Sequence, residues 1–544
     1  MSRAEPPAGA GTTAARSPAP DTPVPRVAPG AGGNRYRRGL DAALSCGPAA
    51  LAFVLCLIEI TGRSLGFDEG ATVAIVAQHG GALSSGIAHD GGNMSGYYLA
   101  LHVLTGVFGT SELAIRLPSA IATAATSALV VLLATRLFDR RVALISGLLS
   151  AVSLPLVYWG QNARGYAPMV ALTVAAFLSL VVLVDVEGGR RGRRLAWIGY
   201  VVFTVLAIYS SFVAVLVVPA QLVTVLWYRR AARPLAAALV AIAACCVPLV
   251  ALAFRRGPGQ LFWLPRPTLT GEKEVFQALT GAGLQPNFHP TATTTVLLVA
   301  TLVLLLGIAA MIIVRVLRGP RERASWAQTL VLAWLVFPVA FAWIESYFGQ
   351  PILLPRNLLA CAPAAAILLA LGLSHARVPR PLALAGLVAI LALRVLQLAP
   401  SYGVSPEGWQ AASAHVLAGA RPADCVAFYP TDGRMAFQYY LGTGTAAVAR
   451  APRPVLPTAP WGTVRTYVED YATLTQPQLA IVAARCPRLW LVASHVGELD
   501  GPAGALAHRA RYLRLRDAVA REYPHRRTIK FGYASAVQAE LATR

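Results

Sequence analysis

Charged residues are scarce in this chain of 544 residues. Only 13% of the residues are Asp, Glu, Lys or Arg, and 56% are hydrophobic. Soluble domains have about a quarter of their residues charged. The mean hydropathy is +0.56. This composition excludes an ordinary soluble protein and predicts a membrane protein.

Acidic residues are the scarcest charged group. The chain has 25 Asp plus Glu against 47 Lys plus Arg, which gives a formal net charge of +22. Such an excess is one feature of nucleic-acid-binding proteins. Here, however, the Arg residues form short clusters between apolar segments, as they do in the cytoplasmic loops of membrane proteins. The distribution of charge therefore argues against nucleic acid as a partner.

Motifs for several common chemistries are missing. The nine His residues are scattered without the spacing of metal ligands, which argues against a zinc site. The Gly-rich stretches GGALSSG and GTGTA do not lie between a strand and a helix, as a phosphate-binding loop requires. No Ser, His and Asp residues are spaced to support a catalytic triad. The first apolar run starts late, near Ala42, and no clear small-residue cleavage site follows it, so we expect it to be a membrane span rather than a cleavable signal peptide.

Long apolar runs, by contrast, recur between residues 42 and 398. A helix needs about 20 apolar residues to cross the hydrocarbon core of a bilayer. By this measure the chain has about eleven candidate spans. They are 42–60, 113–136, 142–159, 166–185, 195–209, 211–228, 235–254, 294–315, 326–345, 357–374 and 380–398. The two spans that meet near Ser210 form either two helices or one helix that is too long to span once.

The charges of the connections predict the orientation of these spans. With the N-terminus in the cytoplasm, the even-numbered connections are cytoplasmic and basic. Each holds at least two Arg residues: Arg136/Arg140/Arg141, Arg190/Arg191/Arg193/Arg194, Arg229/Arg230/Arg233, Arg315/Arg318/Arg321/Arg323 and Arg377/Arg380. We therefore expect a multi-pass protein of the plasma membrane. The Pro-, Ala- and Gly-rich start predicts a disordered cytoplasmic tail over residues 1–40.

Residues 400–544 have a different character from the membrane region, 41–399. CVAFYP and RLWLVASHV resemble short buried strands, while PEGWQAASAHVLAGA and YLRLRDAVAREY have helical spacing. Strands that alternate with helices predict a small α/β domain, which an eleventh span leaves outside the cytoplasm. Cys425 and Cys486 each start a strand-like run there. Because disulfides persist outside the cytoplasm, the two form a bridge or remain buried free thiols.

The outer loop over residues 61–112 carries the stretch GFDEGATV, in which Asp68 and Glu69 are adjacent. Within this loop, residues 89–109 have helical spacing but a polar start. If this segment spanned the membrane, the orientation of every later loop would invert, so we predict a helix at the membrane interface. The two acids either lie in a solvated loop or at the start of a helix, or they have a catalytic or binding function.

Isolated Arg residues lie near the same predicted face. Arg164 follows in YWGQNARGYAPM and Arg356 in ILLPRNLLA, each at the mouth of a helix. A carboxylate such as that of Asp68 can deprotonate an attacking hydroxyl, while guanidinium groups hold a departing phosphate. The alternative is that the Arg side chains reach lipid headgroups.

Four stretches together resemble a known family. They are GFDEGAT, GTSELAIRLPSAIA (109–122), YWGQNARGYAPM and LLPRNLLACAPAAAILLALGL, in this order and on the predicted faces. Over nearly all of residues 40–400 the chain is similar to the integral-membrane GT-C glycosyltransferases. Specifically, it resembles the bacterial branch related to protein O-mannosyltransferases and the lipid A aminoarabinose transferase. The C-terminal part also resembles C-terminal domains of this branch.

This resemblance implies a reaction. The donor is a sugar, mannose-like by this resemblance, on a polyprenyl phosphate in the outer leaflet. The acceptor is a hydroxyl of a glycan, a lipid or a protein. Asp68, with Glu69 beside it, matches the catalytic acid position and acts as general base for an inverting transfer. Arg164, Tyr166 and Arg356 match positions that bind the donor phosphate; alternatively, Tyr166 belongs to an interfacial aromatic belt.

The sequence departs from the family in two places. The first loop has HDGGNMSGYY where the family often has His-Pro-Pro-Leu-Tyr-Tyr, although His89, Tyr97 and Tyr98 remain as substrate-binding candidates. Asn162 stands where related enzymes have an acid that helps to hold a divalent metal. A Mg²⁺ or Mn²⁺ site prefers several oxygen ligands, so we expect no cofactor and metal-independent transfer.

Other interpretations remain open at this stage. Glu112 and Arg116 are expected to be structural, with Arg116 fixing a helix and Glu112 pairing with it. A transporter or flippase of lipid-linked sugars would share the spans and the Arg residues. It would also need polar residues at the membrane midplane, where this chain has mostly Ala, Val and Leu. A non-catalytic membrane protein that binds glycans is the third alternative.

Overall fold

The computed structural model describes residues 31–185, 189–257, 264, 266–281, 292–375, 378–442, 444–463, 471–497, 503–533 and 536–544. Asp41–Arg544 forms one compact unit.

Helices make up the membrane region, as the apolar runs predict. The first half contains α1 Ala31–Leu57, α2 Phe67–Val76, α3 Gly80–His89, α4 Ser95–Phe108, α5 Glu112–Leu137, α6 Arg140–Ala151, α7 Leu154–Gly160, α8 Tyr166–Val184 and α9 Arg190–Ser210. The second half contains η1 Phe212–Val217, α10 Val218–Tyr228, α11 Ala232–Arg256, α12 Leu269–Leu279, α13 Ala292–Arg318, α14 Arg323–Phe348, η3 Pro355–Cys361, α15 Ala362–Leu373, α16 Arg380–Leu398 and η4 Ala399–Ser401.

The number of spans is slightly lower than the eleven predicted. Within the described ranges nine helices are long and apolar enough to cross a membrane, or ten if the bent pair α6 and α7 is one span. That pair bends by 57°, since Pro155 lacks a backbone N–H and disfavours a helical conformation before it. The predicted span 211–228 is η1 plus α10, which is short. Ser211 is extended between α9 and η1, so these are separate helices.

The start of α1 corrects the predicted extent of the N-terminal tail. We expected disorder over residues 1–40, but α1 begins at Ala31, eleven residues before the predicted span. A helix can extend beyond the apolar part of its span, because its backbone hydrogen bonds are made within the helix. Residues 1–30 lie outside the described residues, so their disorder stays a prediction.

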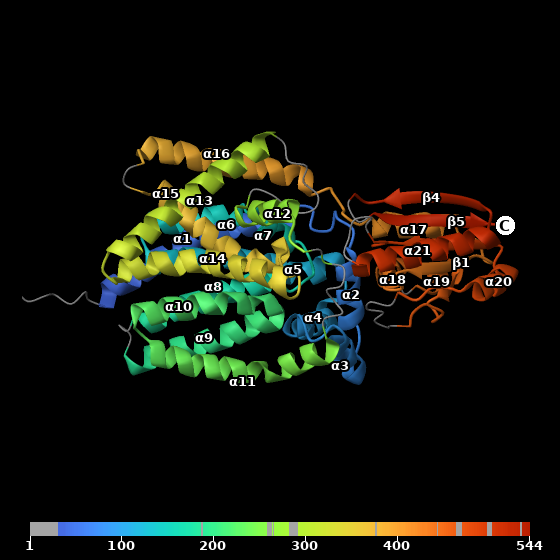
Figure 1. Cartoon of the computed structure of the whole chain (residues 1–544), viewed down its shortest axis with the longest axis horizontal. Coiled ribbons are helices and arrows are strands. Elements are labelled where there is room, and N and C mark those ends of the chain that lie inside the picture. The colour runs from blue at the N-terminus through green and yellow to red at the C-terminus, as the bar shows by residue number, and fades with distance from the viewer. Residues whose placement is uncertain are drawn as a thin grey trace, which may run out of the picture. The chain divides into compact units, whose positions relative to one another are not determined.

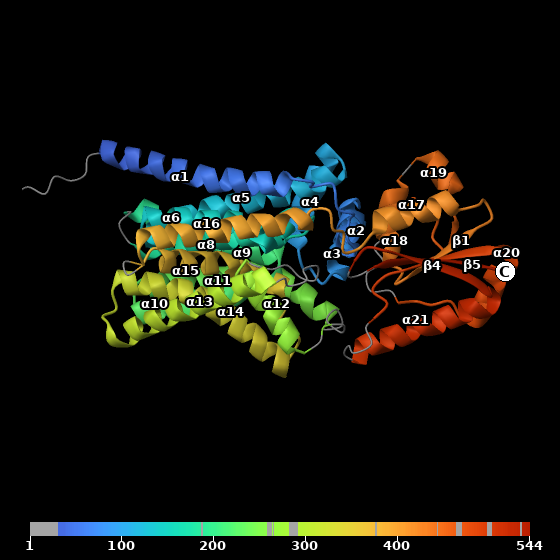
Figure 2. The ribbon, with the colours of Figure 1, turned by 90° about the horizontal axis from the view of Figure 1, so that it is seen from above.

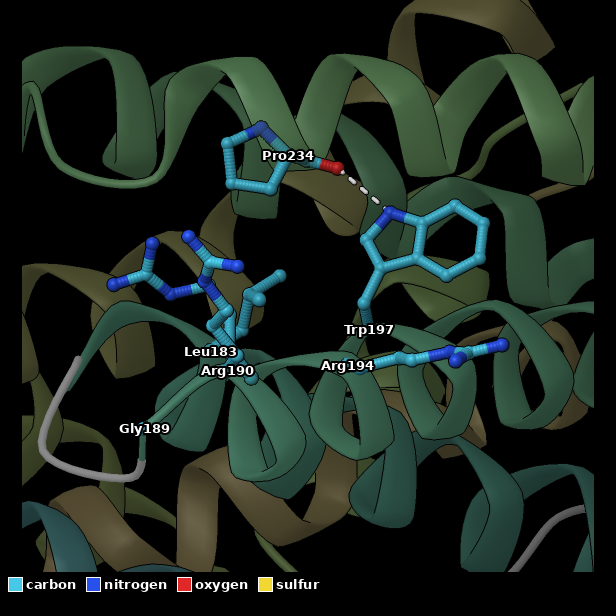
Figure 3. A pocket seen from close by; sticks show the side chains of 7 residues that line it. Leu183, Gly189, Arg190, Arg194, Trp197 and Pro234 are labelled. Atoms are coloured by element: carbon cyan, nitrogen blue, oxygen red, sulfur yellow. Dashed lines mark hydrogen bonds between the residues drawn. The ribbon is translucent and has the colours of Figure 1, made fainter.

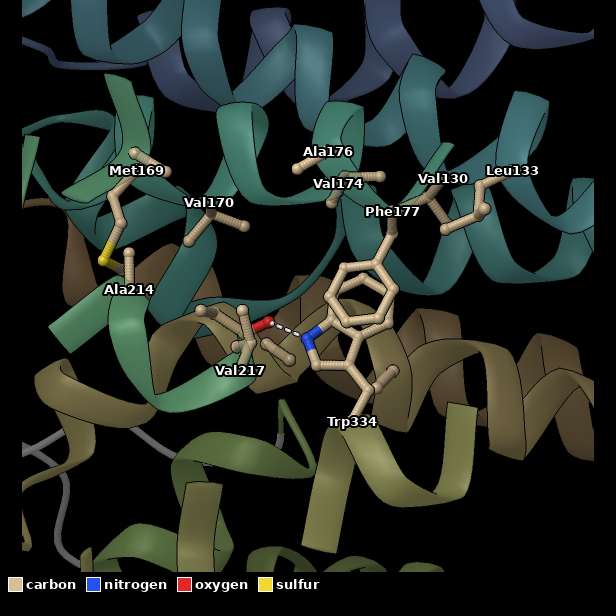
Figure 4. Close-up of a cluster of buried hydrophobic side chains, with 14 of the residues drawn as sticks. Val130, Leu133, Met169, Val170, Val174, Ala176, Phe177, Ala214, Val217 and Trp334 are labelled. Atoms are coloured by element: carbon tan, nitrogen blue, oxygen red, sulfur yellow. Dashed lines mark hydrogen bonds between the residues drawn. The ribbon is translucent and has the colours of Figure 1, made fainter. Parts of the chain in front are cut away.

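Helix α8 is central to the bundle. It runs alongside α5 and α9 (Figure 1, Figure 2). Phe177 of α8 stacks on Trp334 of α14 with ring centroids 3.9 Å apart, and Trp334 Nε1 donates to the Ala360 carbonyl at 2.9 Å (Figure 4). This buried packing holds the helix that begins just after Arg164.

The segment expected at the membrane interface is the short helix α4. It has 14 residues, too few to cross the hydrocarbon core. Leu99, Val103 and Val107 are spaced four residues apart and are 51%, 65% and 72% exposed. The opposite face of α4 is buried through Tyr98 and Leu101. An amphipathic helix of this length agrees with the interfacial prediction.

The C-terminal part is the predicted α/β domain. It has α17 Trp409–Gly419, β1 Cys425–Tyr429, α18 Gly433–Leu441, α19 Thr445–Arg450, β2 Arg453–Leu456, α20 Gln476–Arg485, β3 Arg488–Ala493, α21 Ala503–Glu522, β4 His525–Phe531 and β5 Val537–Thr543. The strand order is β2-β1-β3-β5-β4, with β1 parallel to β2 and β3, and β5 antiparallel to β3 and β4. Helix α17 covers one face of the sheet and α21 the other (Figure 2). Strands β2, β4 and β5 were not predicted: β2 has only four residues, HRRTIKF of β4 is mostly exposed and charged, as edge strands often are, and β5 has no continuous apolar run.

The structure joins Cys425 and Cys486 in a disulfide, with Cα atoms 5.8 Å apart. The bridge links residues 61 positions apart, and closing such a loop restricts the unfolded chain. We expect Cys425→Ser/Cys486→Ser to reduce the free energy of unfolding by about 2–5 kcal/mol. Thermal unfolding of the purified protein in detergent measures this loss. Cys245→Ser, at an exposed free thiol, is the control, and equal melting temperatures for both variants would contradict the prediction.

Candidate active site

The two adjacent acids lie in the first turn of α2. Carboxylates are favoured there by the helix dipole. Successive helical residues point in different directions, and the two side chains accordingly have different surroundings. The side chain of Glu69 is 2% exposed, while that of Asp68 is 47% exposed. Glu69 is therefore inaccessible to a substrate, while Asp68 is accessible.

Glu69 is a buried structural acid, which corrects its assignment as a catalytic residue. Its Oε1 accepts hydrogen bonds from Arg116 Nε at 2.9 Å and the Ala163 N–H at 2.8 Å. Its Oε2 accepts from Arg116 Nη2 at 2.8 Å and the Gly66 N–H at 3.1 Å. Burial opposes ionisation, but the charge of Arg116 and these hydrogen bonds hold the pKa of Glu69 below its usual value. All four acceptor positions of the carboxylate are used, so none remains for a substrate.

Arg116 connects α5 to the chain before α2. It is 1% exposed, and its Nη1 donates to the carbonyls of Ile60 at 2.8 Å and Arg63 at 2.9 Å. Glu112, one turn earlier on α5, lies 3.7 Å from Nη1. This geometry agrees with the structural roles expected for Glu112 and Arg116. The main partner of Arg116, however, is Glu69 rather than Glu112.

Asp68 lies between two guanidinium groups that come from distant parts of the sequence. Its Oδ2 is 3.9 Å from Arg164 Nη2 and 3.9 Å from Arg356 Nη1. Burial raises the pKa of Asp68, but Arg164, Arg356 and His495 together outweigh that effect and hold the pKa below its ordinary 3.8. Asp68 is therefore ionised near neutral pH. We call Asp68, Arg164 and Arg356 the acid–arginine cluster.

Tyr98 holds Arg164 in place. Arg164 Nη1 donates to Tyr98 Oη at 3.0 Å, and Tyr98 Oη donates to Asp90 Oδ2 at 2.9 Å. Tyr98 is 0% exposed, so a substrate cannot reach it, and its contact with Arg164 serves to orient the guanidinium group. Arg164 Nε is buried without a hydrogen-bond partner. An unsatisfied charged donor of this kind favours an anion beside it.

The other predicted substrate residues are more scattered. His89 lies at the exposed end of α3, and Tyr97 is 4% exposed on α4. Tyr166 is 5% exposed and packs on Trp159 with ring centroids 4.5 Å apart, which places it inside the protein rather than on its surface. Asn162 is partly buried, and its Oδ1 has no hydrogen-bond partner. Within the described ranges, no hydrogen bond joins Tyr166 or Asn162 to Asp68.

Sequence reasoning missed two residues of the C-terminal domain, Glu407 and His495. His495 contributes to the low pKa of Asp68, and Glu407 accepts a hydrogen bond from the N–H of Phe67. His495 follows β3, which is parallel to β1. Functional side chains gather beyond the carboxyl ends of parallel strands. The position of His495 near the end of a predicted buried strand was the one feature of the sequence that could have indicated a functional role for it.

The residues near Asp68 do not fit a divalent metal. The carboxylate of Asp68 faces two cations, Glu69 has no free acceptor position, and Asn162 supplies only a neutral oxygen. Hard cations prefer several oxygen ligands, usually including carboxylates. In the described part of the chain, no group of three or more His, Cys, Asp or Glu could hold a metal ion. Metal-independent chemistry stays a prediction.

A cavity of about 380 Å³ lies near the other end of α8. It is lined by Leu183, Gly189, Arg190, Arg193, Arg194, Trp197 and Pro234. Trp197 Nε1 donates to the Pro234 carbonyl at 3.0 Å across from Arg190 (Figure 3). Helix α8 has 19 residues, so it is about 28 Å long. The cavity is therefore remote from the acid–arginine cluster, and we assign it no part in the chemistry.

Solved structures resemble this chain along most of its length. ArnT from Cupriavidus metallidurans in the apo state superposes with a TM-score of 0.55 at 14% identity, covering 93% of this chain and 98% of ArnT. The same protein bound to undecaprenyl phosphate gives a TM-score of 0.54 at 14% identity, with 91% and 97% covered. This chain has the GT-C fold. The GT-C resemblance predicted from four motifs is thus confirmed.

Two further comparisons agree with the GT-C fold. The archaeal oligosaccharyltransferase AglB from Archaeoglobus fulgidus, in complex with an inhibitory peptide and a dolichol-phosphate, has a TM-score of 0.51 at 11% identity. The match covers 85% of this chain and 70% of AglB. The family of dolichyl-phosphate-mannose-protein mannosyltransferases matches residues 94–253. No curated protein matches the chain in sequence. With its apolar spans and its GT-C fold, this chain is an integral membrane protein.

Proposed function

We propose that this chain is a glycosyltransferase that moves a sugar from a polyprenyl phosphate to an acceptor hydroxyl. The observation that carries the proposal is the acid–arginine cluster, in which an ionised, half-exposed carboxylate lies beside two guanidinium groups. The undecaprenyl phosphate bound to ArnT and the dolichol-phosphate bound to AglB support a lipid-phosphate donor. The match of residues 94–253 to mannosyltransferases supports a mannose-like sugar.

In the proposed reaction Asp68 removes the proton from the acceptor hydroxyl. The acceptor oxygen forms a bond to the anomeric carbon as the bond from that carbon to the phosphate oxygen breaks, and the configuration inverts. The electron pair of the broken bond stays on the polyprenyl phosphate. Arg164 and Arg356 stabilise the charge that develops there. The reaction takes place outside the cytoplasm, with the N-terminus inside and the C-terminal domain outside.

Binding of the donor also makes Asp68 a stronger base. Without substrate, Arg164 and Arg356 lower the pKa of Asp68 and make it a weak base. A bound phosphate pairs with the same two guanidinium groups and neutralises part of their charge. The pKa of Asp68 then rises toward a value better suited to proton removal. The base is therefore strengthened when the donor is present.

The test is transfer from radiolabelled lipid-linked sugars in membranes that contain the protein. Polyprenyl-phosphate-mannose and polyprenyl-phosphate-aminoarabinose are compared in parallel, with matched membranes that lack the protein as the control. Protein-dependent label in a glycan, lipid or protein fraction supports the proposal and identifies the acceptor class. Equal label with and without EDTA supports metal independence. Protein-dependent movement of intact donor across the membrane, without transfer, would instead support a transporter.

The acid limb of the pH profile should depend on Arg356. Because this guanidinium lowers the pKa of Asp68, Arg356→Gln raises that pKa, and less of the base is ionised at low pH. The acid limb of kcat/KM, which reports the free enzyme, is therefore expected at higher pH in Arg356→Gln than in wild type. Arg356→Lys keeps the charge and should keep the limb near its wild-type position. An acid limb that coincides in wild type and Arg356→Gln would contradict the assignment.

A further inference from the structure

The first turn of α2 is held by a side chain of the C-terminal domain. Glu407 lies between η4 and α17, and its side chain is 13% exposed. Its Oε2 accepts hydrogen bonds from the Phe67 N–H at 2.6 Å and from Trp409 Nε1 at 2.8 Å. The first N–H groups of a helix have no partner within the helix. Glu407 thus satisfies a free N–H directly before Asp68, from 340 residues away in the sequence.

His495 completes this contact from a second loop of the same domain. Its Nε2 lies 3.5 Å from Glu407 Oε1, and its ring lies 4.8 Å from the ring of Phe67, centroid to centroid. The backbone of His495 has a φ of 48°, which is uncommon for a non-glycine residue. Strained conformations of this kind persist where the surrounding structure requires them, often at functional sites.

Helix α18 contacts α2 from another side. A Cβ on Gly70 would lie 2.9 Å from the backbone N and Cα of Ala436, so the two helices touch through their backbones. Just before α2, the Leu65 N–H donates to Tyr440 Oη at 2.6 Å, and Tyr440 Oη donates to Glu112 Oε1 at 2.8 Å. The C-terminal domain therefore holds both α2 itself and the residues that lead into it.

We propose that Glu407 and His495 are positioning residues for Asp68, so that the C-terminal domain forms part of the catalytic site. By holding the first turn of α2, the pair keeps the Asp68 carboxylate between Arg164 and Arg356. This inference rests on the proposed function. It assigns the domain a role in the rate of the reaction, which is distinct from selection of the acceptor. Small displacements of a reacting group are costly, with about 1 Å reducing a rate by about 10²-fold.

The test uses the full chain in detergent and two substitutions at one position. Glu407→Ala removes the acceptor of the Phe67 N–H. Glu407→Gln keeps a side-chain oxygen that can accept the same hydrogen bond. The matched control is Glu522→Ala, which removes a carboxylate bonded to Gln476 on another part of the same domain. Hydrogen exchange of peptides over residues 61–76 and the kcat and KM for donor are measured for each protein.

We expect Glu407→Ala to speed exchange in the first turn of α2 by at least about tenfold, because the Phe67 N–H loses its hydrogen-bond acceptor. We also expect kcat to fall by about 10²-fold with little change in donor KM. Glu407→Gln and Glu522→Ala should stay near wild type in both measurements. His495→Phe, which keeps the ring beside Phe67 but loses the contact with Glu407, should fall between wild type and Glu407→Ala.

Two results would overturn the positioning role. One is unchanged exchange in the first turn of α2 in Glu407→Ala. The other is faster exchange there with an unchanged kcat, since the contact would then be structural only. If Glu407→Ala does not fold, His495→Phe is judged by the same two criteria. If wild type transfers no sugar, the proposed function fails, and exchange alone then decides whether this pair holds Asp68.

Discussion

Asp68→Asn should reduce sugar transfer by about 10²–10⁴-fold while the protein remains folded, because an amide cannot accept the proton of the acceptor hydroxyl. Asn has nearly the same shape as Asp, and the Asp68 side chain is 47% exposed, so its replacement costs little stability. The change also leaves Arg164 and Arg356 without the carboxylate that competes with a phosphate for them. The donor KM should therefore stay level or fall while kcat falls.

This combination of effects separates a base from a binding group. A residue that only bound the donor would raise KM when removed and leave kcat nearly unchanged. Steady-state transfer in purified enzyme measures both quantities, with Asp517→Asn, at an exposed acid on α21, as the matched control. Wild-type kcat in Asp68→Asn would mean that Asp68 is a solvated acid at a helix start, and the catalytic assignment would be lost.

Arg116→Ala should destabilise the protein by about 3–5 kcal/mol, because it leaves the buried carboxylate of Glu69 without its cation. The substitution also removes the donors that bind the carbonyls of Ile60 and Arg63. Since these contacts tie α5 to the chain before α2, we expect low amounts of folded protein in membranes. Thermal unfolding in detergent measures the loss in the protein that can be purified.

Arg140→Ala is the control for this prediction. Arg140 pairs with Asp41 at 3.0 Å, but the two side chains are 43% and 25% exposed. Solvent screens such a pair, and its removal should cost at most about 1 kcal/mol. If Arg116→Ala and Arg140→Ala lowered the melting temperature equally, the buried pair would not have the structural importance that its geometry indicates.

The spans and the C-terminal domain could be predicted because they depend on local patterns. A run of about 20 apolar residues forms a helix in almost any membrane protein, since the bilayer cannot satisfy free backbone groups. The two buried strands β1 and β3 were recognisable as short apolar runs. The errors occurred where the pattern was weak, at the strands β2, β4 and β5 and at the bend between α6 and α7.

The acid–arginine cluster could be predicted only in part. Asp68, Arg164 and Arg356 were identified from the motifs around them, and the structure brings all three together. Glu69 was assigned to catalysis with Asp68 because the two are adjacent in sequence. Adjacent residues on a helix point in different directions, so adjacency says little about a shared role.

The sequence by itself determined that this chain is a helical membrane protein with a small α/β domain, because hydrophobic patterning and charge distribution act locally along the chain. It also identified the stretch that carries Asp68. Only the tertiary structure decided which of the two acids is free to react, since that depends on whether Arg116 lies beside it. Likewise, the contact of Glu407 with α2 joins residues 340 positions apart, and such a contact leaves no periodic signal in the sequence.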